Sequence, residues 1–267
     1  MSLPTDHARR AYDVFASFYD TFVARHDHAH WAAMLLAEAE RAGLRGLRLL
    51  DVGCGTGESF LAMLDRGFEV TACDVSPAMV EVARSKANGR ASVSVHDMRM
   101  LPDLGGFDLV WCLGDAVNYL QDQEELVAAL AGMRRNLAPD GILVFDVNTL
   151  ATCRHVYSAL WVIPAELEVL VLDGRGSRSL TPGGSAEVWI DRFHALDGDG
   201  WARERSVHHH RHHPLEDIGA ALAAADLELV ACRGSTDEGL DADADESRHI
   251  KAVFLARHVR TRRGEGR

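Results

Sequence analysis

Short apolar runs of strand length alternate with amphipathic segments through the first half of the chain. The runs lie at 47–53, 68–74, 91–97, 107–113 and 141–147. Helical segments separate most of them, at 57–66, 76–87 and 121–137. This alternation is typical of a parallel sheet with helices on both faces. Two further helices are expected before the first strand, over 6–25 and 29–43.

The pattern changes after Asn148. Residues 161–213 show the alternation of strands, and turn sequences interrupt it at Asp173-Gly174, Pro182-Gly183-Gly184 and Asp197-Gly198-Asp199-Gly200. These features predict an antiparallel insertion. A helix at 214–225 and strands at 227–233 and 249–257 are expected to complete the main sheet, with the acidic stretch 237–247 as a solvated loop.

The predicted fold class is therefore α/β, with a doubly wound, mostly parallel seven-stranded sheet of Rossmann-like type and an antiparallel β insertion or lid. The predicted organisation is an N-terminal helical lid, a ligand-binding core, the insertion, the completion of the core sheet and a disordered tail, at 1–45, 46–150, 151–213, 214–258 and 259–267.

Composition narrows the class of protein. The 267 residues, of which 47% are apolar and 25% charged, fit one globular domain with an insertion. A formal net charge of −12 disfavours a nucleic-acid partner. Five scattered cysteines without a CxxC pair predict free thiols, and no metal site is predicted. No apolar stretch resembles a signal peptide or a membrane span, so we expect a cytoplasmic protein.

The strongest motif ends the first predicted strand, in Asp51-Val-Gly-Cys-Gly-Thr-Gly57. Ligands of doubly wound sheets bind beyond the carboxyl ends of the strands. Glycines there permit positive φ and close approach to the main chain, and the following helix N-terminus favours a carboxylate. An acidic residue at the strand end suits a ligand with an ammonium group. The pattern resembles the class I S-adenosylmethionine (SAM)-dependent methyltransferases; a structural turn or another nucleotide site is the alternative.

The resemblance implies further cofactor residues at the ends of the next strands. Asp74 ends the second strand and can accept hydrogen bonds from both ribose hydroxyls, unless it only caps the helix beginning near Ser76. Asp97 would accept from the adenine amino group, with helix capping as the alternative. Met79 would lie near the adenine or in the core. The predicted cofactor residues are Tyr12, Asp51, Gly53, Cys54, Gly55, Gly57, Asp74, Val75, Met79, Asp97, Met98 and Leu113.

Three features resemble small-molecule N-methyltransferases, namely those of glycine and sarcosine, of amino sugars and of lincosamide-type antibiotics. They are the tyrosines of AYDVFASFYDTF, the pair LGDAVNYL and FDVNT, and the insertion that leads into PLEDIGAALAAADLEL. The resemblance implies a small-molecule methyl acceptor, a place in natural-product (antibiotic) metabolism and possible self-association into a homo-oligomer. It does not select one substrate.

Tyrosines and polar residues are the candidates for the acceptor site. Tyr12 and Tyr19 are seven residues apart and would share one helix face, either over the cofactor or in amphipathic packing. Asp115 follows the fourth strand, beside the expected position of the methyl group; capping is its alternative. The predicted substrate-binding residues are Tyr19, Asn118, Tyr119, Asn148 and Arg211. A magnesium site on Asp115, Asp146 and Asn148 is an alternative.

The run SVHHHRHHP (206–214) is the most conspicuous feature of the second half. On a strand, His208, His210 and His212 share one face, and His209, Arg211 and His213 share the other. An imidazole near the acceptor could take a proton, and the candidates are His210 and His213. A solvated edge strand without a chemical role is the alternative. The predicted catalytic residues are Tyr12, Tyr19, Asp115, His210 and His213.

Methyl transfer from a sulfonium needs mainly alignment and exclusion of water. An amine acceptor has only to arrive unprotonated, whereas a hydroxyl acceptor gains more from a base. The hypothesis is a SAM-dependent N-methyltransferase of a small molecule. An O-methyltransferase and a SAM-binding protein without catalysis are the alternatives.

Overall fold

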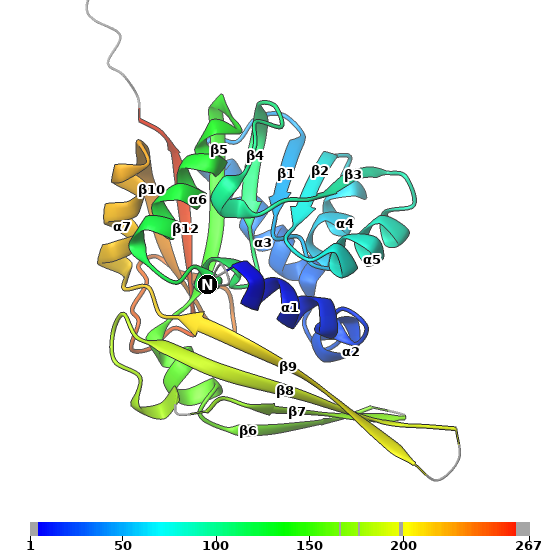
Figure 1. Cartoon of the computed structure of the whole chain (residues 1–267). Coiled ribbons are helices and arrows are strands. Elements are labelled where there is room, and N and C mark those ends of the chain that lie inside the picture. Colours follow the sequence, from blue (N-terminus) through cyan, green and yellow to red (C-terminus); the bar gives the residue numbers. More distant parts are fainter. Residues whose placement is uncertain (1–4, 166, 176, 198–199, 260–267) are drawn as a thin grey trace, which may run out of the picture.

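The computed structural model describes residues 5–165, 167–175, 177–197 and 200–259 (Figure 1). Within these ranges the strands form one eight-stranded sheet and one four-stranded antiparallel sheet. The predicted fold class, a mostly parallel doubly wound sheet with an antiparallel insertion, is confirmed. The larger sheet has eight strands where seven were predicted, because the two-residue strand Leu240–Asp241 extends its edge. The tail predicted at 259–267 and the turn at 198–199 lie outside the described residues, apart from Val259.

The larger sheet has the strand order β11-β10-β12-β5-β4-β1-β2-β3. Strands β5, β4, β1, β2 and β3 run parallel, and β12, β10 and β11 continue the sheet antiparallel. The order reverses between β1 and β4, where an α/β sheet opens a crevice for ligands. The bounds in chain order are β1 (Arg48–Val52), β2 (Glu69–Asp74), β3 (Ala91–Val95), β4 (Phe107–Cys112), β5 (Leu137–Asn148), β10 (Leu227–Ser235), β11 (Leu240–Asp241) and β12 (Lys251–His258).

Helices cover both faces of this sheet, and each face has its own apolar core. Alternate residues of β1, β4 and β5 point to opposite faces. Leu49, Leu109 and Val144 pack under α3 (His28–Arg41), α4 (Glu58–Leu64) and α5 (Pro77–Ala87). Leu50, Val110 and Phe145 pack under α6 (Gln123–Arg135) and α7 (Leu215–Ala224). Two short 3-10 turns, η1 (Met98–Met100) and η2 (Ala116–Tyr119), follow β3 and β4.

The insertion is a long antiparallel sheet that extends beyond the core (Figure 1). Its order is β6 (Leu160–Pro164), β7 (Glu168–Asp173), β8 (Ser185–Ala195) and β9 (Trp201–Arg211), and the turns η3 (Thr152–Val156) and η4 (Ser177–Ser179) precede β6 and β8. The N-terminal helix lies between this sheet and the core. Phe15, Phe18 and Met79 form one buried cluster with Leu170 and Val188 of the insertion.

The prediction of one continuous helix over 6–25 is wrong, because the segment forms two helices. The structure has α1 (Thr5–Phe15) and α2 (Tyr19–Val23), with a turn at 16–18 in which the Phe18 amide donates to the Phe15 carbonyl at 3.0 Å. The turn brings Phe18 onto Phe15, with ring centres 4.9 Å apart, so both rings are buried. Tyr12 and Tyr19 therefore lie on two helices and not on one helical face.

The acidic stretch is held more firmly than a solvated loop. Leu240 and Asp241 form β11 against Gly234 and Ser235. The Asp241 carboxylate lies 2.9 Å from Nε2 of the buried His249. Residues Asp237 and Glu238 remain exposed, as predicted. None of the helices in the described ranges is long and apolar enough to span a membrane.

Two glycine substitutions test these contacts. Gly219 lies in α7 with open space around its Cα, so Gly219→Ala should raise the free energy of unfolding by about 0.5–1 kcal/mol. A Cβ at Gly234 would overlap the His249 ring, so Gly234→Ala should lower it by about 1–3 kcal/mol. Urea unfolding at pH 7 measures both changes. Equal effects of the two substitutions would show that the His249 contact does not form.

Candidate active site

The glycine loop between β1 and α4 forms the floor of the candidate site. Gly53, Gly55 and Gly57 have φ of 73°, 54° and 94°, which favour glycine. A Cβ at Gly57 would lie 2.7 Å from the Phe60 ring, and one at Gly55 would lie 3.9 Å from the Tyr19 phenol. The loop therefore exposes main chain to the crevice, beneath the N-terminal helices.

Asp51 lies at the end of β1 and is almost fully buried, with 1% exposure. One carboxylate oxygen, Oδ2, accepts a hydrogen bond from Ser59 Oγ at 2.7 Å. The other, Oδ1, has no partner among the described residues. Burial raises the pKa of Asp51 to about 7, against the lowering effects of the neighbouring Ser59 and Trp111 side chains. A buried carboxylate with one unused oxygen is suited to a cationic ligand group.

Asp74 connects β2 to the glycine loop. Its carboxylate accepts hydrogen bonds from the Gly55 and Ser76 amides, each at 2.9 Å. The residue that caps α5 is Ser76, whose hydroxyl accepts from the Met79 amide at 3.2 Å. The alternative that Asp74 is only the cap of this helix is therefore wrong. Val75 lies partly exposed between them, and Met79 is fully buried in the cluster that joins α1 to the insertion.

Asp97 caps a helical turn, which is the alternative to its predicted role in adenine binding. It accepts from the Arg99 amide at 3.0 Å at the start of η1. The Arg99 guanidinium pairs with the Asp97 carboxylate at 2.8 Å and with Glu125 at 2.5 Å. Met98 lies beside the glycine loop, since its methyl group is 3.7 Å from the Cβ position of Gly53. Asp97 thus lies at the crevice, with one cationic partner already present.

Asp146 is the most completely enclosed charge of the site. It has 0% exposure, and four groups donate to its carboxylate. The Asp115 amide and Lys251 Nζ contact Oδ1 at 2.7 and 3.0 Å. The Gly114 amide and Trp31 Nε1 contact Oδ2 at 3.1 and 3.3 Å. These contacts join α3, the turn after β4 and β12 at the carboxyl end of β5.

Asp115 projects from this turn in a left-handed conformation, with φ of 58°. Lys251 Nζ lies 3.3 Å from its Oδ1, so one ammonium joins two carboxylates. Burial raises the pKa of Asp115, and the nearby Lys251 ammonium lowers it. Burial has the larger effect, so the pKa of Asp115 is raised. The ammonium lies between Asp115 and Asp146, where the magnesium alternative would need its cation. No motif indicated Lys251, because its position depends on the register of β12 against β5.

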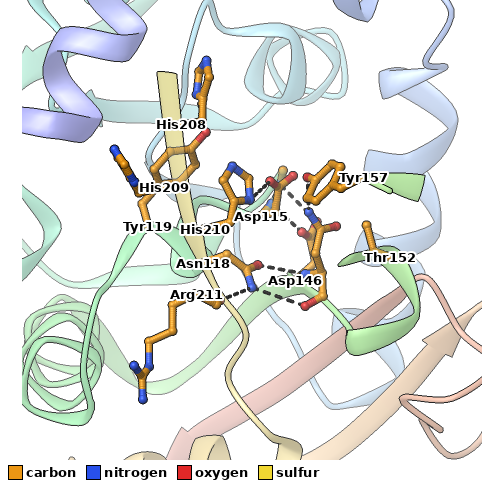
Figure 2. A network of polar contacts seen from close by, with 12 residues as sticks. Asp115, Asn118, Tyr119, Asp146, Thr152, Tyr157, His208, His209, His210 and Arg211 are labelled. Atoms are coloured by element: carbon orange, nitrogen blue, oxygen red, sulfur yellow. Dashed lines mark hydrogen bonds and ion pairs between the residues drawn. The ribbon is translucent and has the colours of Figure 1, made fainter. Parts of the chain in front are cut away.

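An aromatic and imidazole cluster faces Asp115 from η2, the end of η3 and β9 (Figure 2), and α1 adds Tyr12 to it. Ring centres lie 4.4 Å apart for Tyr119 and His210, 5.3 Å for Tyr157 and His210, and 5.2 Å for Tyr12 and Tyr119. Tyr12 and Tyr19 lie 6.4 Å apart although they belong to different helices. The structure therefore brings four predicted residues together and adds Tyr157, which no motif indicated.

His210 faces the Asp115 carboxylate without bonding to it. Its Nδ1 lies 3.6 Å from Asp115 Oδ2 and has no hydrogen-bond partner in the described part of the chain. Burial lowers the pKa of His210 to about 3, and the Lys251 ammonium contributes, so the imidazole is neutral at pH 7. The alternative of a solvated strand is wrong for this face of β9, since His208 and His210 are buried, as is His212 just beyond the strand.

The remaining predicted residues support the cluster. Asn118 is buried, donates to the Arg211 carbonyl at 2.9 Å and accepts from the Asn148 amide at 2.8 Å. Asn148 in turn donates to the Tyr157 hydroxyl at 2.7 Å. The Arg211 side chain extends away from Asp115 and His210 (Figure 2). Nε2 of His213 bonds to the Leu120 carbonyl at 3.0 Å, which places this imidazole behind η2.

Comparisons with known proteins agree with this geometry. A family model described as a methyltransferase domain matches residues 49–141. The putative methyltransferase YqeM of Bacillus subtilis is 27% identical over 223 residues, 82% of this chain and 87% of that protein. The SAM-bound structure of CalS10, an amino pentose methyltransferase from Micromonospora echinaspora, matches with a TM-score of 0.72 and 26% identity over 91% of this chain and 97% of that one. The chain is a SAM-dependent methyltransferase.

A further relative has an amine acceptor in its name. The dTDP-3-amino-3,6-dideoxy-alpha-D-glucopyranose N,N-dimethyltransferase of Streptomyces fradiae is 32% identical over 120 residues, 45% of this chain and 47% of that protein. The residues of the methyltransferase fit SAM on physical grounds as well. Asp51 has an unused buried oxygen for an ammonium group, and the glycine loop and the N-terminus of α4 present main-chain amides to a carboxylate.

Binding of SAM should depend on the ionisation of Asp51. Because the pKa of this carboxyl is about 7, it loses its charge as the pH falls below 7. We expect the Kd for SAM to rise by up to about tenfold per pH unit between pH 7 and 5.5. Calorimetry at several pH values measures this change. Methylthioadenosine, which lacks the amino-acid part of SAM, is the matched ligand and should show a smaller dependence. The assignment would be contradicted if the Kd values of both ligands depended equally on pH. It would also be contradicted if the Kd of Asp51→Asn for SAM kept the pH dependence of the unsubstituted protein.

The Lys251 bridge should be worth more than an ordinary surface pair. Lys251→Met leaves Asp146 buried beside Asp115 without their shared cation, and should lower the free energy of unfolding by about 3 kcal/mol. Lys86 is the matched control, because it also joins two carboxylates, Asp20 and Glu58, which are more exposed. Lys86→Met should cost less than about 1 kcal/mol. Similar losses in urea unfolding would refute the special role of Lys251.

Proposed function

We propose that this methyltransferase transfers the methyl group of SAM to an amine of a small molecule in natural-product metabolism. The observation that carries the proposal is the facing pair of His210 and Asp115. A neutral Nδ1 without a partner and a carboxylate oxygen lie 3.6 Å apart and are not bonded to each other. When both atoms are hydrogen-bond acceptors, they call for a group with two N–H bonds, which a primary amine has and a hydroxyl lacks.

The cofactor supplies an electrophilic methyl group on a sulfonium. For its binding we propose that Asp51 receives the ammonium, the α4 N-terminus the carboxylate and Asp74 the ribose hydroxyls. Asp97 and the Met98 amide would meet the adenine, beside Met79. The main chain of Leu113 and Gly114 would pass beneath the cofactor. Support comes from the partner-free oxygen of Asp51 and from the positions of these residues around one crevice.

On the acceptor side, we propose that His210 and Asp115 orient the amine by accepting its N–H bonds. The amine nitrogen attacks the methyl carbon with its lone pair, and the proton that its product then carries passes to His210 or Asp115 and on to water. Tyr12 and Tyr19 close the site from the N-terminal helices and exclude solvent. The CalS10 and Streptomyces fradiae relatives, named for an amino pentose and an amino sugar, support an amine acceptor.

Product analysis tests the proposal. The protein is incubated with SAM and matched pairs of amino sugars or amino acids and the analogues in which a hydroxyl replaces the amine. We expect methyl groups on nitrogen, located by mass spectrometry and carbon NMR. Methylation on oxygen would favour the O-methyltransferase alternative, and SAM binding without any methylated product would favour the non-catalytic one.

His210→Gln should lower kcat/KM for the amine by roughly tenfold or more, with little change in SAM affinity, because an acceptor of the amine protons is displaced. His194→Gln, in the same sheet on β8, is the matched control and should leave kcat/KM unchanged. The pair of assays uses saturating SAM at pH 7.5. Equal activity of the two variants would remove His210 from the site.

A further inference from the structure

His208 lies between two hydroxyl groups in the interior of the acceptor site. Its Nδ1 is 2.7 Å from the Tyr119 hydroxyl, and its Nε2 is 2.8 Å from Ser206 Oγ. His208 and Ser206 are 2% and 1% exposed, so water does not compete for these bonds. Figure 2 shows His208 and Tyr119 next to each other on the side of His210 away from Asp146. The result is a buried chain that runs from Ser206 through the imidazole to the Tyr119 phenol.

The direction of the hydrogen bonds in this chain follows from their number. Burial lowers the pKa of His208 to about 3, so the ring is neutral and has one donor and one acceptor nitrogen. Among the described residues, the buried Ser206 hydroxyl forms its side-chain hydrogen bond with His208 and with no other group. If Nε2 were the donor, the Ser206 proton would be buried without an acceptor, which is costly. Ser206 therefore donates to Nε2, and Nδ1–H donates to the Tyr119 oxygen.

The consequence concerns the phenol proton. The Tyr119 oxygen accepts from His208 and also forms a hydrogen bond with Tyr12. This second bond acts to lower the pKa of Tyr119 and to raise that of Tyr12, as expected when Tyr12 is the donor. The O–H of Tyr119 itself then remains available as a donor. Tyr119 lies against His210, with ring centres 4.4 Å apart, and therefore next to the pair of acceptors that we assign to the amine. The reacting nitrogen must keep its lone pair for the methyl group. Within the acceptor molecule, the phenol can thus donate only to an atom other than the reacting nitrogen.

We infer that Ser206 and His208 are positioning residues that fix Tyr119 as a hydrogen-bond donor to an oxygen next to the methylated amine. This inference rests on the proposed function and deepens it. The methyl acceptor is then an amine that carries a neighbouring hydroxyl or ether oxygen. His210 and Asp115 accept the N–H bonds, and the Tyr119 O–H donates to the oxygen. One molecule with both groups satisfies the three side chains at once.

The tautomer of His208 gives a readout that does not depend on activity. In protein with 15N-labelled histidine at pH 7, NMR should show His208 neutral with its proton on Nδ1. Ser206→Ala removes the donor to Nε2 and should shift the ring toward the Nε2–H form. A proton on Nε2 in the unsubstituted protein would overturn the inference, whatever the outcome for methylation. The expected tautomer without any N-methylated product would instead refute the proposed function.

A double-mutant cycle tests whether Ser206 acts through Tyr119. Tyr119→Phe should lower kcat/KM by roughly tenfold for an amine with a neighbouring oxygen, and much less for the same amine without it. Ser206→Ala should lower kcat/KM by roughly three- to tenfold in the unsubstituted protein and have no further effect in Tyr119→Phe. Ser177→Ala, which also removes a buried serine hydrogen bond from the insertion, should leave kcat/KM unchanged. Additive losses from Ser206→Ala and Tyr119→Phe would reduce Ser206 and His208 to a structural role and overturn the inference.

Discussion

The site depends on one buried negative charge, that of Asp146. A carboxylate without exposure to water is costly unless its oxygens accept hydrogen bonds. Here the donors come from Trp31, the Gly114 and Asp115 amides and Lys251, which belong to three separate parts of the chain. The requirement to satisfy this charge fixes the turn after β4 and holds Asp115 in its left-handed conformation. It thereby aims the Asp115 carboxylate at β9.

The cofactor side of the crevice is held by the same physical means. Asp74 binds the Gly55 amide and so ties the glycine loop to β2. The N-terminal helices are fixed to this region by two short contacts, Ser76 to Asp13 at 2.6 Å and Thr56 to Asp20 at 2.7 Å. Each contact joins a hydroxyl next to the crevice to a carboxylate on α1 or α2. The covering helices are therefore positioned by polar contacts at the rim as well as by the Phe15 and Phe18 packing.

Local patterns in the sequence were sufficient for the sheet and the glycine loop. Apolar runs, turn residues and the Asp51–Gly57 motif each act over a few neighbouring positions, and the strands formed where they were expected. Features that depend on distant partners were missed. Lys251, Trp31 and Tyr157 reach the site only through strand register and helix packing, and no motif surrounds them. The break at 16–18 arises because burying Phe18 beside Phe15 outweighs the continuation of the helix.

The histidine run shows how a structural residue can set the chemistry of its neighbours. The side chains of a strand alternate, so a shift of one residue would bury His209 and Arg211 in place of His208 and His210. His212 opposes such a shift, because its amide donates to the Gly184 carbonyl at 2.9 Å and its Nδ1 accepts from the Gly183 amide at 3.2 Å. Its Nε2 also contacts Glu246 at 2.7 Å. The turn before β8 and the acidic stretch therefore fix the register that turns two neutral imidazoles toward Asp115 and Tyr119.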